Sequence, residues 1–260
     1  MLWGLVLFFL LSSVWSLEKK FINFGGFVCP REEKALGICL RDALNAFIPQ
    51  IASGIPQFNV PPCEPLLIKS ISIKQGAGPI TLTSSFSDVT VRGPSTLKIK
   101  NVVVQPEKQR VIAKLHFAEL KMKGHYSMKG QILMLPVEGD GEFTAKYGNI
   151  DATVTIKLGR RPRANSSDAL SCEDLHVKFH IGQASMHLGS LFGGDNELGN
   201  AMNKFFNDNW EPISEELREP MEEALRDFLR PLADHTFGIL DADDILLPDD
   251  TDKETSDKKH

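Results

Sequence analysis

The sequence predicts an α+β fold in which a long C-terminal helix is rolled inside a highly curved antiparallel β-sheet, an arrangement called a super-roll. Apolar residues recur every three or four positions over 196–232, as one side of an amphipathic helix requires. Apolar and polar residues instead alternate through much of 66–188, the pattern of half-buried strands. The helical stripe repeats slightly more slowly than the period of about 3.6 residues, so its apolar side turns around the axis. Such a stripe fits inside a curved sheet better than in a straight coiled-coil dimer.

The predicted C-terminal helix would be about 55 Å long at a rise of roughly 1.5 Å per residue. Asp195 or Asn196 is the expected N-cap, since either side chain can accept hydrogen bonds from the first free N–H groups. Pro212, Pro220 and Pro231 lie inside the stripe, and each is expected to bend the helix because it removes a backbone hydrogen bond. The stripe comprises Leu198, Met202, Phe206, Trp210, Ile213, Leu217, Met221, Leu225, Phe228 and Leu232.

A second helix is predicted near the N-terminus, over 32–51. Within the strand region, the continuously apolar run 132–135 predicts a strand buried on both faces. Over 111–122 the apolar positions change parity, which predicts a β-bulge near Ala118 and hence local curvature of the sheet. The apolar side of the N-terminal helix comprises Leu36, Leu40, Leu44, Phe47 and Ile51.

Residues 1–16 are predicted to be a secretory signal peptide, because the apolar run 2–11 is too short to cross a bilayer core of about 30 Å. No later segment reaches membrane-spanning length, so no stable membrane insertion is expected. The prediction therefore places one β-rich domain over 17–248 of a secreted, extracellular protein. The polar and charged residues 249–260 are predicted to form a disordered tail.

The four cysteines fit an oxidising compartment. Cys29 and Cys39 are close in the sequence and are the expected disulfide pair. Cys63 and Cys172 then form either a second disulfide or two separate buried thiols; a bridge over so long a loop would stabilise the fold by about 4–5 kcal/mol in the loop-entropy account. Asn165 begins an N-glycosylation sequon in a polar loop, and the basic cluster 160–163 beside it is interpreted as a solvated turn.

The formal net charge of −5 and the even spread of charge argue against binding of nucleic acid. Motifs for a serine nucleophile, a zinc protease, a phosphate loop or a dinucleotide site do not occur. His176 and His180 share one strand face, but the charge of Lys178 between them opposes a divalent cation. The acidic residues 241–252 do not have the glycine that a calcium-binding loop needs. We therefore predict no metal, no cofactor and no catalytic residue, and no enzymatic activity.

Apolar residues remain in excess, and the sequence alone does not separate plain core from the wall of a cavity. Flexible thioethers and flat aromatic rings line adaptable apolar pockets well, which favours the methionine and aromatic positions of the C-terminal helix. The candidate ligand-contacting residues are Met202, Phe205, Phe206, Trp210, Ile213, Leu217, Met221 and Phe228.

Several short motifs occur in a fixed order along nearly the whole chain. They are Cys29 with Cys39, Gly54-Ile55-Pro56, Pro61-Pro62, Glu64-Pro65-Leu66, Gly124-x-Tyr126, Gly130-x-Ile132-Leu133-x-Leu135-Pro136, Gly139-x-Gly141, Leu191-Phe192, Gly194-Asp195, Leu198-Gly199, Met202-Asn203 and Asn207-x-Asn209-Trp210. In these motifs the chain resembles the takeout and juvenile hormone-binding protein family of arthropods, within the tubular lipid-binding superfamily. The resemblance implies a hydrophobic tunnel along the rolled helix that holds an elongated apolar small molecule, a terpenoid hormone or another lipid, without chemistry.

The leading hypothesis is thus a secreted, non-enzymatic carrier whose partner is a hydrophobic small molecule. The alternative is a membrane- or lipopolysaccharide-binding defence protein of similar architecture, for which the basic cluster 160–163 would be the contact. A hydrolase of lipid esters is a third hypothesis, which the missing nucleophile–base pair disfavours. The oligomeric state and the identity of the ligand are not predicted.

Overall fold

The computed structural model describes residues 21–24, 27–30, 32–56, 60–76, 78–132, 135–164 and 167–246. The predicted signal peptide (1–16), the predicted tail (249–260) and the sequon residue Asn165 lie outside the described residues. These three assignments, and the domain limits 17–248 that depend on them, stay predictions.

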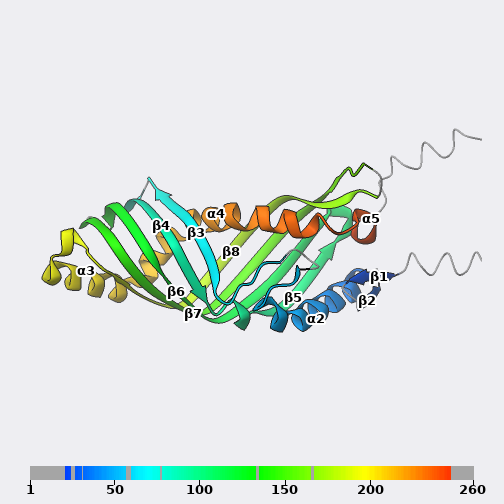
Figure 1. The fold of residues 1–260 in the computed structure, drawn as a ribbon, viewed down its shortest axis with the longest axis horizontal. Coiled ribbons are helices and arrows are strands. Elements are labelled where there is room, and N and C mark those ends of the chain that lie inside the picture. The colour runs from blue at the N-terminus through cyan, green and yellow to red at the C-terminus, as the bar shows by residue number, and fades with distance from the viewer. Residues whose placement is uncertain are drawn as a thin grey trace, which may run out of the picture.

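The main sheet curls around the C-terminal helix, as Figure 1 shows. Its strand order is β3-β4-β6-β7-β8, and β5 pairs with the first half of β6 while β4 pairs with the second half. Helix α4 contacts both β8 and β3, the two ends of this order, so the helix lies where the roll closes. The predicted super-roll is confirmed. The strands are β3 (Leu66–Gln75), β4 (Ile80–Arg92), β5 (Lys98–Gln105), β6 (Arg110–Ile132), β7 (Leu135–Arg161) and β8 (Ala169–Leu188).

The N-terminal segment forms a small hairpin and a helix beside β5. Helix α2 (Glu33–Ile51) confirms the helix predicted over 32–51, and its buried side packs on Val102 and Val104 of β5. Gly37 allows this close packing, because a Cβ at that position would collide with the carbonyl oxygen of Val102. Short 3-10 turns connect the strands. The remaining elements here are β1 (Phe21–Phe24), β2 (Phe27–Pro30), η2 (Pro94–Thr96) and η3 (Pro106–Lys108).

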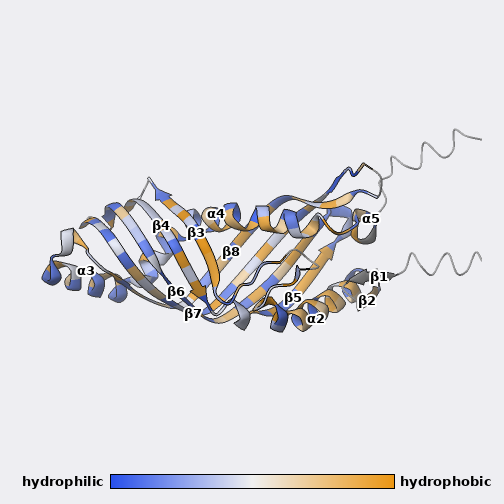
Figure 2. Cartoon of the chain, viewed as in Figure 1, coloured by the Kyte–Doolittle hydropathy of each residue, from blue (hydrophilic) through white to orange (hydrophobic). Residues whose placement is uncertain are grey.

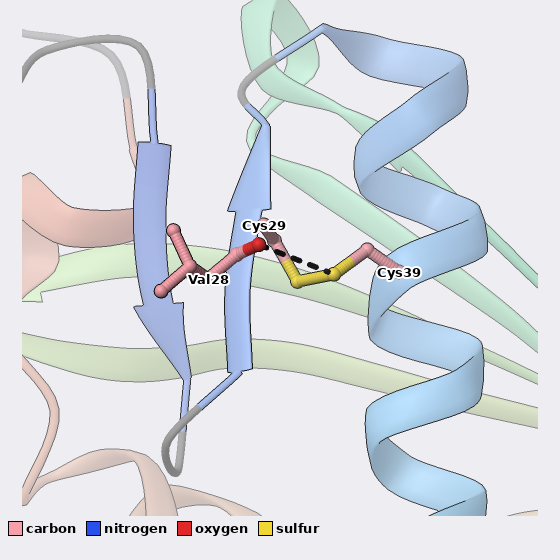
Figure 3. The surroundings of a disulfide bond; sticks show 3 residues. All are labelled: Val28, Cys29 and Cys39. Carbon is pink, nitrogen blue, oxygen red and sulfur yellow. Dashed lines mark hydrogen bonds between the residues drawn. A yellow bond between two sulfur atoms is a disulfide. The ribbon is translucent and has the colours of Figure 1, made fainter. Parts of the chain in front are cut away.

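A disulfide joins this hairpin to the helix. Cys29 of β2 is bonded to Cys39 of α2, with 5.6 Å between their Cα atoms, which confirms the predicted pair (Figure 3). The Cys39 sulfur also lies 4.0 Å from the carbonyl oxygen of Val28. The bond therefore fixes the hairpin on the first turns of α2.

The C-terminal stripe forms two helices, so the prediction of one continuous helix is wrong. After the turn η4 (Phe192–Gly194), α3 (Asn196–Asp208) ends at Asn209, whose φ of −118° and ψ of 25° are not helical, and α4 (Trp210–Phe237) begins at once. The break places Pro212 in the first turn of α4, where a missing N–H costs nothing. Pro220 and Pro231 lie inside α4 without ending it. Asp195 is the N-cap of α3, as predicted, and accepts a hydrogen bond from the Leu198 N–H at 3.0 Å.

Two strand predictions are also wrong. Ile132 and Leu135, the two described residues of the run 132–135, pair with each other, and Leu135 is exposed, so the run is not one strand buried on both faces. The register of β6 with β7 does not change across Ala118, where Phe117 pairs with Ile150 and Glu119 with Gly148. The register shifts lie instead between β4 and β6 after Ser87, and between β5 and β6 after Ile99. A change in which positions of a strand are apolar therefore does not show whether the bulge lies on that strand or on the strand paired with it.

The basic cluster 160–163 lies against acidic residues of the segment 234–243. It is therefore not the solvated turn that we predicted. Arg163 donates to the Asp241 carboxylate at 2.7 Å and to the carbonyl oxygens of Gly238 and Leu240 at 2.6 and 3.2 Å. Each of the other two arginines has its own aspartate partner, in the pairs Arg160–Asp243 and Arg161–Asp234. We call these six residues the Arg–Asp cluster. It ties the β7–β8 loop to the end of α4 and to α5 (Ala242–Ile245).

Cys63 and Cys172 are separate buried thiols. The second disulfide is therefore wrong, and the alternative of two unpaired thiols holds. Burial raises the pKa of both thiols above the ordinary value, which keeps them protonated and unreactive near neutral pH. Among the described helices, none is long and apolar enough to cross a membrane.

An apolar cavity between the sheet and helix α4

A cavity lies in the larger of the hydrophobic clusters, between the inner face of the sheet, α3 and α4. Its volume is about 890 Å³ with its opening to solvent included. The wall draws on strands β3, β4, β6, β7 and β8 and on both C-terminal helices. The lining residues are Ile73, Leu82, Ser84, Phe86, Met128, Ile132, Phe143, Ala145, Tyr147, Ile181, Ala184, Met186, Leu188, Phe206, Trp210, Ile213, Ser214, Leu217 and Met221.

The local periodicities of the chain explain this wall. Along β7, Phe143, Ala145 and Tyr147 line the cavity, whereas Thr144 and Lys146 between them are exposed, since successive side chains of a strand point to opposite faces. The strands in Figure 2 show the resulting alternation of apolar and polar residues. The helices contribute residues three or four positions apart, which lie on one side of a helix. The super-roll thus converts two sequence periods into one apolar interior.

The structure brings five of the eight predicted ligand-contacting residues to the cavity wall: Phe206, Trp210, Ile213, Leu217 and Met221. The other three are not among the lining residues. Met202 is buried in the surrounding core, and Phe205 and Phe228 are partly buried against it. Whether any of them contacts a ligand stays a prediction.

The sequence analysis missed the strand half of the wall. Leu82, Phe86 and Phe143 are inward-facing strand residues, and the alternation over 80–86 and 143–147 was the signal that could have identified them. The rings of Phe86 and Phe143 lie edge to face, with centroids 5.1 Å apart, so they are neighbours across the sheet.

The cavity wall contains very few polar groups. The Ser84 hydroxyl donates to the carbonyl oxygen of Ile73 at 3.4 Å. The Tyr147 hydroxyl makes no hydrogen bond within the part of the chain that the structure describes, and burial raises the pKa of Tyr147 above its ordinary value. Tyr126 on β6 differs, because its hydroxyl donates to the carbonyl oxygen of Gly189 at 2.7 Å. Tyr147 is thus a neutral phenol that faces the cavity with an unused donor.

The two sides of α4 are fastened unequally to the sheet. On the β8 side, polar side chains of α3 and α4 bond to backbone groups of the strand: Asn203 to Leu188, Asn207 to Met186, Glu222 to Phe179, Arg230 to Glu173 and Asp234 to Cys172. On the β3 side, the described residues show one side-chain bond to a backbone group, and here the side chain belongs to the strand: Gln75 Nε2 donates to the carbonyl oxygen of Glu216 on α4 at 3.5 Å. Ile73 and Leu217, on either side of this weaker seam, both line the cavity.

The described residues contain no group of three or more His, Cys, Asp or Glu side chains that could hold a metal ion. His176 instead lies 2.9 Å from Asp174, and His180 is in cross-strand register with Asp151. The arrangement therefore offers apolar surface, the Tyr147 phenol and the Ser214 hydroxyl for binding.

A rolled sheet that encloses an apolar cavity beside a long helix defines a class of proteins that bind hydrophobic molecules. The sequence model described as "Haemolymph juvenile hormone binding protein (JHBP)" matches residues 5–247, and the chain belongs to this family of binding proteins. The resemblance that the sequence motifs indicated is confirmed.

Individual relatives agree with this assignment. The chain is 22% identical over 195 residues to the Circadian clock-controlled protein daywake of Drosophila melanogaster, covering 72% of this chain and 74% of that protein. Daywake of Drosophila yakuba is 20% identical over 227 residues, covering 84% and 85%. The crystal structure of Epiphyas postvittana Takeout 1 superposes with a TM-score of 0.68 at 25% identity, covering 82% of this chain and 96% of that one.

Proposed function

We propose that the protein is a secreted carrier that binds an elongated hydrophobic small molecule, a terpenoid hormone or a lipid, in the cavity and performs no chemistry on it. The single observation that carries the proposal is the apolar wall of the cavity, which five strands and both C-terminal helices form, since ligand sites are lined mostly by hydrophobic and aromatic side chains. Membership of a family described by juvenile hormone binding supports the same ligand class. Burial of apolar ligand surface, at roughly 25 cal/mol per Å², would supply most of the affinity.

Tyr147 gives the proposed ligand one polar requirement. A buried hydroxyl without a partner costs about 1–3 kcal/mol, which a bound acceptor such as a carbonyl, ether or epoxide oxygen would recover. The favoured ligand is therefore an apolar chain or ring system with one oxygen that reaches the Tyr147 hydroxyl. Phe206, Trp210, Ile213, Leu217 and Met221 would contact its apolar part.

The first experiment is native mass spectrometry of the protein secreted from insect cells, followed by denaturing extraction and identification of the released lipid. A stoichiometric terpenoid, fatty acid or quinone supports the proposal. An empty protein that also binds none of a panel of such ligands contradicts it. The same spectra test the chain ends: a mature start near Leu17 supports the signal peptide, and a mass loss on removal of N-glycans supports glycosylation of Asn165.

A pair of tryptophan variants tests the location of binding. Ala184 lines the cavity and pairs across the sheet with Tyr147, so Ala184→Trp fills the space beside the phenol. Its neighbour Gln183 is exposed, and Gln183→Trp is the matched control. We expect Ala184→Trp alone to weaken displacement of a fluorescent hydrophobic probe at least tenfold. Equal probe binding by both variants would place the ligand elsewhere.

A further inference from the structure

The outer face of the same sheet wall carries a second hollow, of about 1050 Å³ with its open side included. Ala145 and Met186 line both this hollow and the apolar cavity, so the two lie on opposite faces of β7 and β8. Met122 and Asn207 also line the hollow, and the rest of its border consists of cationic and hydroxyl side chains. They are Thr90, Arg92, Lys121, Lys123, Thr144, Lys146, Ser185 and His187.

Strand register places the cations directly opposite one another on neighbouring strands. Arg92 of β4 pairs with Lys121 of β6, which pairs with Lys146 of β7. Directly opposite residues have Cβ atoms about 4.5–5.5 Å apart, and like charges in such positions repel each other. Lys123, in the next outward row, lies between Thr90 and Thr144. Repulsion of this kind is relieved when an anion binds among the cations.

The protein itself supplies only part of the compensating charge. Glu119 accepts ion pairs from Lys121 and Lys146, both at 2.7 Å, and these two hydrogen bonds hold the pKa of Glu119 below its ordinary value. The charge of Arg92 attracts the carboxylate of Glu64, which also accepts a hydrogen bond from the N–H of Gly93 at 3.0 Å. Lys123 lies opposite two threonines, and it forms no ion pair with the residues that the structure describes. The hollow is therefore locally positive in a chain whose formal net charge is −5.

We infer that this hollow binds the anionic headgroups of a lipid surface. Ammonium and guanidinium groups beside hydroxyls donate several hydrogen bonds to one phosphate or carboxylate, and the wide, open shape suits a headgroup presented from outside. The cationic side chains are exposed, so they can reach a surface without rearrangement of the sheet. The inference rests on charge and register, and it is separable from the proposed function in the cavity behind it.

Co-sedimentation with vesicles tests the inference. We expect the protein to bind vesicles of phosphatidylcholine with phosphatidylserine, to ignore phosphatidylcholine alone, and to be released by salt. Arg92→Gln combined with Lys123→Gln should lower the partition coefficient about 30-fold, since each basic residue near such a surface contributes roughly 1 kcal/mol. Lys114→Gln combined with Lys178→Gln is the matched control, because these lysines lie on β6 and β8 but do not border the hollow.

Three results would overturn the inference: no binding to the anionic vesicles at low salt, an equal loss in both double variants, or binding of inorganic phosphate without binding to vesicles. Fluorescent-probe binding is measured on the same samples. In the unchanged protein, probe binding without vesicle binding contradicts the inference alone, whereas vesicle binding without probe binding contradicts the carrier function alone.

Discussion

The side-chain amide of Asn203 binds both backbone groups of Leu188. Its Oδ1 accepts from the Leu188 N–H at 2.8 Å, and its Nδ2 donates to the Leu188 carbonyl oxygen at 2.9 Å. One turn later, Asn207 makes the same pair of bonds to Met186, both at 2.8 Å. Spacings of four along a helix and two along a strand both advance about 6 Å, so two amides match the edge of β8.

Replacement of Asn203 by Asp should destabilise the protein by about 2–3 kcal/mol. The substitution keeps the acceptor but replaces the donor with an oxygen that faces the carbonyl of Leu188, and Asn203 is buried. Denaturant unfolding measures the change. Asn200→Asp, at an exposed position on α3, is the control and should shift the midpoint little. Equal shifts in the two variants would show that the pairing adds no stability.

Stability should fall in alkali because of Tyr126. Its pKa is raised from 10.0 to about 12, chiefly by burial. A phenol whose folded pKa is raised stabilises the fold fully below pH 10, and this contribution is lost between pH 10 and about 12 because the unfolded state ionises first. Tyr126→Phe removes this titration. The difference in unfolding free energy between the two proteins should therefore narrow as the pH rises from about 9 to about 11.5, a range that covers most of the titration. A constant difference would contradict the assignment.

Removal of the Tyr147 hydroxyl should change ligand preference and not stability. The hydroxyl has no hydrogen-bond partner among the residues that the structure describes, so Tyr147→Phe should unfold at the same or slightly higher denaturant concentration. Its affinity for a ligand with one carbonyl or epoxide should drop about tenfold, the effect of one hydrogen bond, while binding of a plain hydrocarbon probe stays the same. Equal loss for both ligands would indicate a packing defect instead.

Ligand exchange should proceed through the seam between β3 and α4. Gln75→Cys with Glu216→Cys, joined by a flexible bis-thiol reagent, should slow release of a bound probe at least tenfold. Lys178→Cys with Glu222→Cys, joined in the same way on the β8 side, serves as the control and should leave the rate unchanged. Release from the first cross-linked protein that is as fast as from the second would exclude this route.

Within the Arg–Asp cluster, Arg163 should contribute measurably to the stability of the fold. Arg163→Gln removes one ion pair and two bonds to carbonyl oxygens of a half-buried side chain, and should cost about 1–2 kcal/mol. Arg218→Gln removes an exposed pair with Glu215 within α4 and should cost less than about 0.5 kcal/mol. Thermal unfolding in low and high salt separates the two, since carbonyl bonds persist in salt.

The sequence predicted elements that depend on local period and composition, and failed where tertiary contacts decide. Both the super-roll and the α2 helix follow from apolar spacing. The break at Asn209 was missed because the stripe continues in phase across it. The run 132–135 was misassigned because its composition does not reveal that β6 ends at Ile132 and β7 begins at Leu135. Similarly, the pairing of residues 160–163 with aspartates 73 to 83 positions away left no local signal.

For the cavity, the helix residues were the easier half to predict. Trp210 and Leu217 are large apolar residues that recur with a clear helical period. Ala145 and Ala184 instead leave space in the cavity because their side chains are small, and the pattern of apolar residues does not predict that space. Met202 of α3 and Phe228 of α4 share that period, yet both pack in the surrounding core and are not among the lining residues. That the Tyr147 hydroxyl makes no hydrogen bond to the described residues could not be predicted, because it depends on which residues the fold places around it.

The bonds from Asn203, Asn207, Glu222 and Asp234 to β8 mean that backbone pairing alone does not complete the roll on this side. In a barrel closed by strands, the circumference is set by main-chain hydrogen bonds that every sequence shares. Here it is set by the lengths and positions of a few helix side chains. Substitution of one residue on α3 or α4 could therefore widen or narrow the interior while every strand keeps its register. Relatives with this fold have a route to different cargo sizes that leaves the sheet itself unaltered.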